Sequence, residues 1–437
     1  MGALLRLTLL LCMALGLAPF SARAAASETA TQDRPDASSS PEAPAPPADS
    51  GVEAHATDAR EDHPASLDAT IEAAPASPPH IASSPIVEPP RPAAEMQDQQ
   101  RYFFHGYDFG SQALFNPLTN VINRGFDVLQ LRGENRDPFT ELHGSDMRNV
   151  LDNLAHPYAR VSEEGRWKFT REELLPLSWT QDTMRWAPNY TLHLIGGGMT
   201  YTALREWYLD HSVPWPGLFS ALTVMTSAFI NESLENKGVQ GRNTDCIADI
   251  YFFDLGGILL FSFAPINRFF SETVVVADWS MQPGLTWPGR ALNNQGNYFA
   301  MKWSLPFYTP LRLFAHLGLG SLLGLSYRLP SGLSWSLAAG LRSTRLVNHS
   351  QVSLENEVDL AATVGLFVDR HESLLASLQV SNVRDYFINV NVYPNAFVHV
   401  GSGIGLWSAV SKSGALVVGV SVVRALGLGA GLGNVYR

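Results

Sequence analysis

From Asn297 to Arg424, apolar and polar residues alternate with a period of two, the spacing of side chains on the two faces of a β-strand. Between Leu333 and Arg342, alternate positions hold leucine, tryptophan or alanine, and the positions between them hold mainly serine, glycine or alanine. The runs are about ten residues long and are separated by turn residues, as in strands that cross a membrane. The pattern predicts an antiparallel sheet with one apolar and one polar face.

The polar face is small and lightly charged, which suits a narrow lumen, and the apolar face suits lipid. Because a bilayer cannot satisfy open strand edges, such strands must close. We therefore predict a transmembrane β-barrel of about 8 strands over residues 291–437, and this part resembles bacterial outer-membrane β-barrels. The last strand is expected to end near Arg424, before a glycine-rich tail. A soluble β-sandwich or barrel is the alternative.

The N-terminus has the layout of a secretory signal peptide. A short basic segment, Met1–Arg6, precedes an apolar core, Leu7–Pro19, and a small-x-small cleavage site at Ala22–Ala24. We predict that residues 1–24 are removed on export, because the core is too short to span a bilayer well. An uncleaved anchor is the alternative.

Residues 25–100 are rich in Ala, Pro, Ser and acidic residues and have almost no aromatic residues, which predicts a disordered linker. The linker holds 14 acidic and 3 basic residues, and its net charge of −11 equals that of the whole chain. Residues 101–437 are therefore close to neutral. They show no basic stripe, so we expect no nucleic-acid partner.

Residues 101–290 are expected to form a semi-apolar helical subdomain, so the predicted fold class is α+β. The expected helical segments are Phe115–Leu131, Asp146–Ala155, Tyr190–Asp210, Trp215–Leu234 and Thr244–Phe263. Polar or glycine residues interrupt the last three, and aspartate in a helix opposes membrane insertion. We expect these helices to pack in or against the barrel, at its periplasmic mouth or as a plug. Three inner-membrane helices are the alternative.

Carboxylates gather at the end of one predicted helix and the start of the next. Glu232 and Glu235 are three residues apart, and Asp245 and Asp249 are four apart, so each pair shares a helix face. A turn with two glycines would fold the helices back on each other. The candidate catalytic residues are His193, Glu232, Glu235, Arg242, Asp245 and Asp249.

Paired carboxylates beside a histidine can act as general acid and base or hold a divalent cation. A structural role is the alternative, in which Arg242 pairs with Glu232 or Asp245 and the other groups cap helices. The sequence shows no cofactor-binding motif, because the run Gly196–Gly198 lacks the spacing of a dinucleotide loop. The histidines lack zinc-ligand spacing, so the sequence leaves a metal unknown.

Residues 232–257 resemble the E-x-x-Q, R, D, D, G pattern of VanZ-like envelope membrane proteins. The matching residues are Glu232, Glu235, Arg242, Asp245, Asp249 and Gly256. The chain departs from that pattern at Glu235, where the family has Gln, and at Phe253, near where it has Asn. The resemblance implies an envelope context and no particular reaction.

Together these features predict an outer-membrane barrel protein of the Gram-negative envelope with a structural, channel or assembly role. Its expected partners are outer-membrane lipids and an envelope or periplasmic protein. The alternative is a lipid-modifying envelope enzyme, a hydrolase or acyltransferase, that uses the carboxylates at 232–249.

Overall fold

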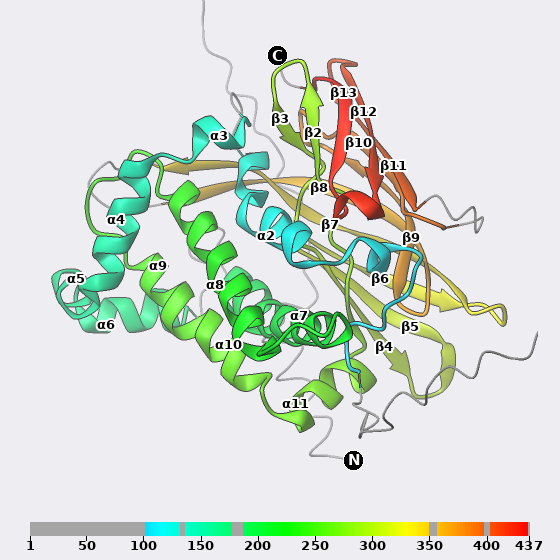
Figure 1. Ribbon diagram of the computed structural model, residues 1–437, viewed down its shortest axis with the longest axis horizontal. Helices are drawn as coiled ribbons and strands as arrows, with labels where there is room; N and C mark the ends of the chain where they lie inside the picture. The colour runs from blue at the N-terminus through cyan, green and yellow to red at the C-terminus, as the bar shows by residue number, and fades with distance from the viewer. Residues whose placement is uncertain (1–100, 132–135, 177–186, 349–355, 397–402, 436–437) are drawn as a thin grey trace, which may run out of the picture. The chain divides into compact units, whose positions relative to one another are not determined.

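The computed structural model describes residues 101–131, 136–176, 187–348, 356–396 and 403–435. The predicted signal peptide and linker lie outside these residues. Figure 1 shows helices in the first half of the described chain and a large sheet in the second. The predicted α+β class is therefore confirmed.

Apart from the short η8 Val423–Ala425, the helices of the described chain precede the sheet. They cover the five expected segments and include further short helices outside those segments. Their bounds are η1 Ser111–Leu114, α2 Pro117–Gly125, η2 Asp127–Leu131, α3 Pro138–Glu141, α4 Gly144–Ala155, α5 Pro157–Glu164, α6 Arg166–Phe169, η3 Thr170–Leu174, η5 Ala187–Gly197, α7 Gly198–Asp210, α8 Pro216–Glu235, α9 Asp245–Ile247, η6 Ala248–Asp254, α10 Leu255–Leu260, α11 Ala264–Arg268 and η7 Phe269–Thr273. Local chemistry sets the starts: Asn116 and Thr119 form a capping box on α2, and Pro216 opens α8.

The sheet has thirteen strands in the order β1-β4-β5-β6-β7-β8-β9-β10-β11-β12-β13-β2-β3. Their bounds are β1 Val276–Asp278, β2 Gly284–Trp287, β3 Ala291–Asn293, β4 Phe299–Leu305, β5 Tyr308–Leu317, β6 Gly320–Arg328, β7 Leu333–Asn348, β8 Asn356–Arg370, β9 Ser373–Ser381, β10 Ile388–Val392, β11 Ile404–Val410, β12 Leu416–Val422 and β13 Gly429–Gly433. Neighbouring strands are antiparallel except β13 and β2. The sheet therefore has more strands than the predicted eight. Its hydrogen-bonded ladder ends at β1 and β3, so the ladder itself does not close.

Two boundaries differ from the prediction. The sheet starts at Val276, before residue 291, because β1 to β3 belong to it. The tail beyond Arg424 is not outside the sheet: Gly429–Gly433 forms β13, between β12 and β2. A side chain at Gly431 would lie 3.0 Å from Thr286 and 3.2 Å from Trp407, so glycine permits this close strand packing.

Burial on the sheet is inverted relative to a water-soluble protein. Along β7, Ser334, Ser336 and Arg342 are buried, whereas Trp335 and Leu337 are 47% and 59% exposed. The pattern recurs on other strands between β5 and β12, although the apolar residues Phe314, Phe367, Trp407 and Ala409 are also buried there. Buried polar residues include Arg312, Ser326, Thr363, Gln379, Asn391 and Ser421, and exposed apolar residues include Leu313, Leu325, Val364, Leu378, Leu406 and Val418. The predicted separation of a polar and an apolar face is confirmed.

Helical segments cover both faces of the sheet. The first, η1, lies against the polar face: the Ser111 hydroxyl donates to the carbonyl of Asp278 at 3.0 Å, and Leu114 packs in one cluster with Phe367. Segments η5, α7 and η7 instead cover the apolar face at one end of β4 and β5. There Ile195, Met199 and Phe270 pack with Phe299, Met301, Ala315 and Leu317.

No single helix of the described chain is long and apolar enough to cross a membrane. One bent pair, Asp245–Leu260 with Ala264–Thr273 at 86°, meets the requirements of length and composition when its two parts are taken together.

Candidate functional site

The candidate site lies in the helical layer and is built from four elements. His193 comes from η5, Glu232 from the last turns of α8, and Asp249 and Asp254 from η6. Both η5 and η6 are π-helical, a wide and rare geometry that is found frequently at functional sites. Arg124 on α2 completes the site.

The run Gly196–Gly198 places η5 close to three neighbours, as expected for a glycine run that lets helices approach. A Cβ at Gly196 would lie 2.4 Å from the ring of Phe299 on β4. At Gly197 it would lie 3.0 Å from both Arg124 Nη2 and Asp254 Oδ1, and at Gly198 2.7 Å from the carbonyl of Gly257. The glycines therefore bring the backbone of η5 against β4, against the Arg124–Asp254 pair and against α10.

His193 is held between two aspartates. Its Nε2 lies 3.6 Å from Asp249 Oδ2, and its Nδ1 lies 3.4 Å from Asp254. Asp254 is fully buried and also pairs with Arg124, which keeps it an acceptor. Nδ1 of His193 therefore faces Asp254, and Nε2 faces Asp249. In the neutral tautomer that donates from Nδ1 to Asp254, the Nε2 lone pair would point toward Asp249.

Glu232 and Asp249 form a buried carboxyl pair. They are 1% and 6% exposed and close enough for a hydrogen bond between their side chains. Burial raises the pKa of Glu232 well above its ordinary value, and the charges of Glu235, Asp245 and Asp254 raise it further. Burial and the charges of Asp245 and Glu232 likewise raise the pKa of Asp249. Glu232 Oε2 and Asp249 Oδ1 have no hydrogen-bond partner in the described chain.

The structure brings most of the predicted site residues together. His193, Glu232 and Asp249 present atoms that lie within 4.8 Å of one another. Glu235 and Asp245 are half-buried and act on the pair through their charge. Asp245 is in the first turn of α9, where a carboxylate is favoured, as the structural alternative predicted.

Arg242 does not join the cluster by an ion pair. Among the described residues it forms none, so the predicted pairing with Glu232 or Asp245 is wrong. Its loop is instead held by amides: the backbone N–H of Asn243 donates to Asn153, and the Asn243 side chain donates to Asn236. These amide contacts fix the turn between α8 and α9 without using the charge of Arg242.

Sequence reasoning missed Arg124 and the place of Asp254 in the site. The two residues are 130 positions apart, and Arg124 sits in a short amphipathic helix with no motif around it. One signal was present: Arg124 lies inside the expected helical segment Phe115–Leu131. A guanidinium that is buried in such a helix requires a carboxylate partner, so a distant acidic residue could have been expected.

The geometry of the site disfavours a cysteine nucleophile and allows proton transfer or cation binding. Cys246 is a buried free thiol, and burial raises its pKa well above the ordinary value, so a thiolate nucleophile is disfavoured. An imidazole with one free nitrogen beside two carboxyls can relay a proton or hold a cation. The catalytic role of the six predicted residues stays a prediction.

Comparison of the chain with protein-family models, curated protein sequences and solved structures gives no match. The resemblance of residues 232–257 to VanZ-like proteins therefore stays a prediction from sequence. Function has to be inferred from the site and the surface.

Proposed function

We propose that this chain is an integral outer-membrane protein whose sheet closes as a barrel and anchors the helical layer at the membrane. The observation that carries the proposal is the inverted burial of the sheet. Water-soluble sheets bury the apolar face, whereas membrane barrels turn it to lipid and keep polar groups inside. Strands of 9 to 10 residues, such as β5, β6 and β9, suit the thickness of a bilayer.

A row of leucines across five strands supports lipid contact. Leu313, Leu325, Leu337, Leu366 and Leu378 are paired in register from β5 to β9. Four of them are exposed, by 51%, 49%, 59% and 39%, and Leu366 is half-buried. A row of this kind in water would be a large exposed apolar patch, which monomeric soluble proteins rarely carry.

Closure is supported by the segment that joins the two ends of the sheet. Val276–Asp278 pairs with β4 at one end, and after five intervening residues Gly284–Trp287 pairs with β13 at the other. Trp279 and Met281 continue the first pairing by donating to Tyr298 and Gly296. The carbonyl of Pro283 then accepts from Gly429, at the start of the second pairing. One continuous segment, residues 276–287, therefore forms hydrogen bonds with strands at both ends of the sheet.

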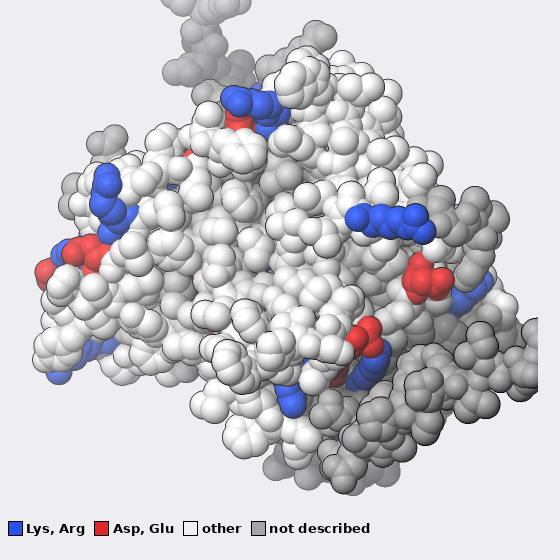
Figure 2. Space-filling model, viewed as in Figure 1, with Lys and Arg blue, Asp and Glu red and all other residues white. Residues whose placement is uncertain are grey.

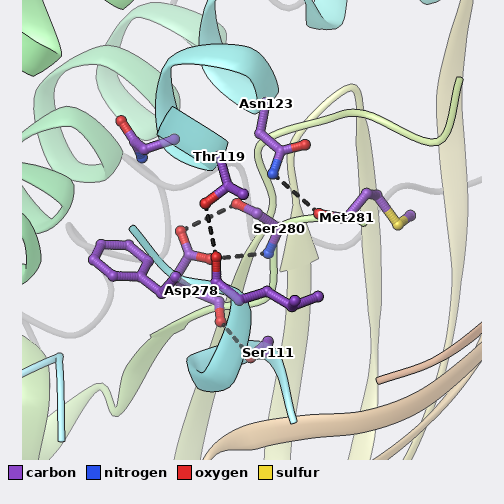
Figure 3. Close-up of a pocket in the computed structure, with 9 residues that line it drawn as sticks. Ser111, Thr119, Asn123, Asp278, Ser280 and Met281 are labelled. Carbon is purple, nitrogen blue, oxygen red and sulfur yellow. Dashed lines mark hydrogen bonds between the residues drawn. The ribbon is translucent and has the colours of Figure 1, made fainter. Parts of the chain in front are cut away.

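Contacts between the helical segments and the polar face of the sheet favour a structural or assembly role over a channel. Arg342 donates to Gln130 of η2 at 2.6 Å, and the Asn123 side chain of α2 donates to the carbonyl of Met281 (Figure 3). The cavity lined by Ser111, Asn123, Asp278 and Met281, among others, has a volume of about 10 Å³, which is room for roughly one water.

The surface of the helical layer also fits a membrane setting. Figure 2 shows a face with few charged side chains, most of them near its border. Exposed apolar residues of the helices include Leu118, Leu218, Phe219, Leu222, Leu255 and Leu259. We propose outer-membrane lipids as the partner of these surfaces, and an envelope or periplasmic protein as a further partner.

Fractionation of cells followed by electrophoresis tests this proposal. We expect the mature chain in the outer-membrane fraction and faster migration of the unboiled than of the boiled sample, because a closed ladder resists detergent. Recovery in the inner membrane, with the same mobility before and after boiling, would contradict both the barrel and its location.

A second candidate function is a lipid-modifying hydrolase or acyltransferase. One observation favours it: η6 carries Asp249 and Asp254 inward, while Tyr251 and Phe252 on the same element are 40% and 49% exposed. The element η6 therefore has Asp249 and Asp254 on its buried side and exposed aromatic residues on its other side. An envelope lipid profile that is the same with wild-type protein and with a folded Glu232→Gln variant would remove this candidate.

A further inference from the structure

Three side chains from separate elements converge on one point in the helical layer. They are His193 of η5, Glu232 of α8 and Asp249 of η6, with ligand atoms within 4.8 Å of one another. We propose that these residues bind one divalent transition-metal ion of the Zn²⁺ or Mn²⁺ class. The proposal is independent of membrane location and of any activity.

The unpartnered oxygens point to a cation between the carboxyls. Glu232 Oε2 and Asp249 Oδ1 are buried without a hydrogen-bond partner in the described chain. Buried carboxylates are ordinarily paired or coordinate a metal, since leaving them unpaired is costly. Within the described residues, neither Glu232 nor Asp249 pairs with a lysine or arginine. Arg124, the arginine of the site, pairs with Asp254.

The histidine is oriented as a ligand. Its Nδ1 lies 3.4 Å from Asp254, which Arg124 in turn holds, so Nε2 is presented toward Asp249. A carboxylate behind the imidazole is the usual support of a metal-bound histidine, because it fixes the ring and increases its basicity.

The distances suit coordination after a small contraction. Two ligands about 2.1 Å from a tetrahedral ion lie roughly 3.4 Å apart. His193 Nε2 and Asp249 Oδ2 are already 3.6 Å apart, and the widest separation in the group is within 4.8 Å.

The ligand types select the class of ion. Ca²⁺ and Mg²⁺ take oxygen ligands, whereas an imidazole with two carboxylates suits Zn²⁺, Mn²⁺ or Fe²⁺. Three protein ligands also leave at least one position for water, as in catalytic zinc sites. Such an ion would tie η5, α8 and η6 together.

The test uses the full mature chain, stripped with a chelator and then dialysed against Zn²⁺, Mn²⁺, Mg²⁺ or Ca²⁺ alone. We expect about one Zn²⁺ or Mn²⁺ per chain and an increase in thermal stability on binding. A separate sample loaded with Co²⁺ is expected to show absorption typical of nitrogen and oxygen ligands. Glu232→Gln and Asp249→Asn are expected to abolish stoichiometric binding. Arg124→Gln, behind the ligands, is expected to weaken it about 10- to 100-fold.

The controls are Asp152→Asn and Glu163→Gln, exposed carboxylates on α4 and α5 that should leave binding unchanged. Failure of the folded wild-type chain to retain any of the four ions would overturn the proposal and leave a proton-sharing carboxyl pair. Retention of Mg²⁺ or Ca²⁺ in preference to Zn²⁺ or Mn²⁺, or equal binding by His193→Gln, would overturn it as well. Metal retention by the wild-type chain tests the proposal even if a variant does not fold.

Discussion

Leu325→Arg is expected to destabilise the protein folded in lipid vesicles by about 2–4 kcal/mol, the cost of an arginine on the lipid face near mid-bilayer. Leu325 is next to the middle residue of β6 and is flanked in register by Leu313 and Leu337. Its side chain is 49% exposed, so an arginine there would meet no steric obstacle. The free energy of unfolding in urea, measured in vesicles, gives the effect.

Leu151→Arg is the matched control for this change. Leu151 on α4 is 53% exposed, lies outside the sheet and should tolerate the charge within about 0.5 kcal/mol. If Leu325→Arg were tolerated as well as Leu151→Arg, the apolar face of the sheet would be in contact with water, and the membrane assignment would be wrong.

Lys302→Met is expected to reduce the free energy of unfolding by about 3–5 kcal/mol, because it leaves the buried carboxylate of Asp369 without its cation. The Lys302 ammonium is fully buried, 2.6 Å from Asp369 Oδ1 and 2.5 Å from Glu372 Oε2. Arg312 compensates Glu372 at 2.7 Å, but Asp369 is fully buried and depends on Lys302. Unfolding in urea again provides the measurement.

The double variant Lys302→Met, Asp369→Leu separates loss of charge balance from loss of packing. Replacing both ions by apolar side chains of similar size is often close to neutral, so the double variant should recover much of the stability lost in the single variant. A single variant as stable as the wild type would show that Lys302 is not needed to balance charge inside the sheet.

The sequence was most informative where side chains alternate. Most strands from β4 to β12 were expected because every second residue, such as Trp335 and Leu337, is apolar, but no run was assigned to β6. Strand β13 was missed because Gly429, Gly431 and Gly433 provide no side chains to define a face. Strands β1 to β3 were missed because three or four residues are too few to show a period.

For the site, helical spacing was enough to predict that Glu232 and Asp249 meet. Helical spacing could not predict which residues from distant parts of the chain hold the site in place. Arg124 contacts Asp254 through the approach of α2 to η6, which the glycine at 197 permits and which no local pattern encodes. The ion pair that the structural alternative expected for Arg242 is absent among the described residues for a related reason, since asparagine amides hold its loop.

The membrane account can be tested most directly along β7, with single nitroxide labels at residues 334–342 in a Cys246→Ala background. Cys246 is the one free cysteine in the described chain and is buried. We expect labels at Trp335, Leu337 and Leu341 to collide readily with oxygen and rarely with a water-soluble nickel chelate, because these positions face lipid. Labels at Ser334, Ser336 and Arg342 should be shielded from both reagents. Free collision of the nickel chelate with Leu337 and Leu341 would contradict the account.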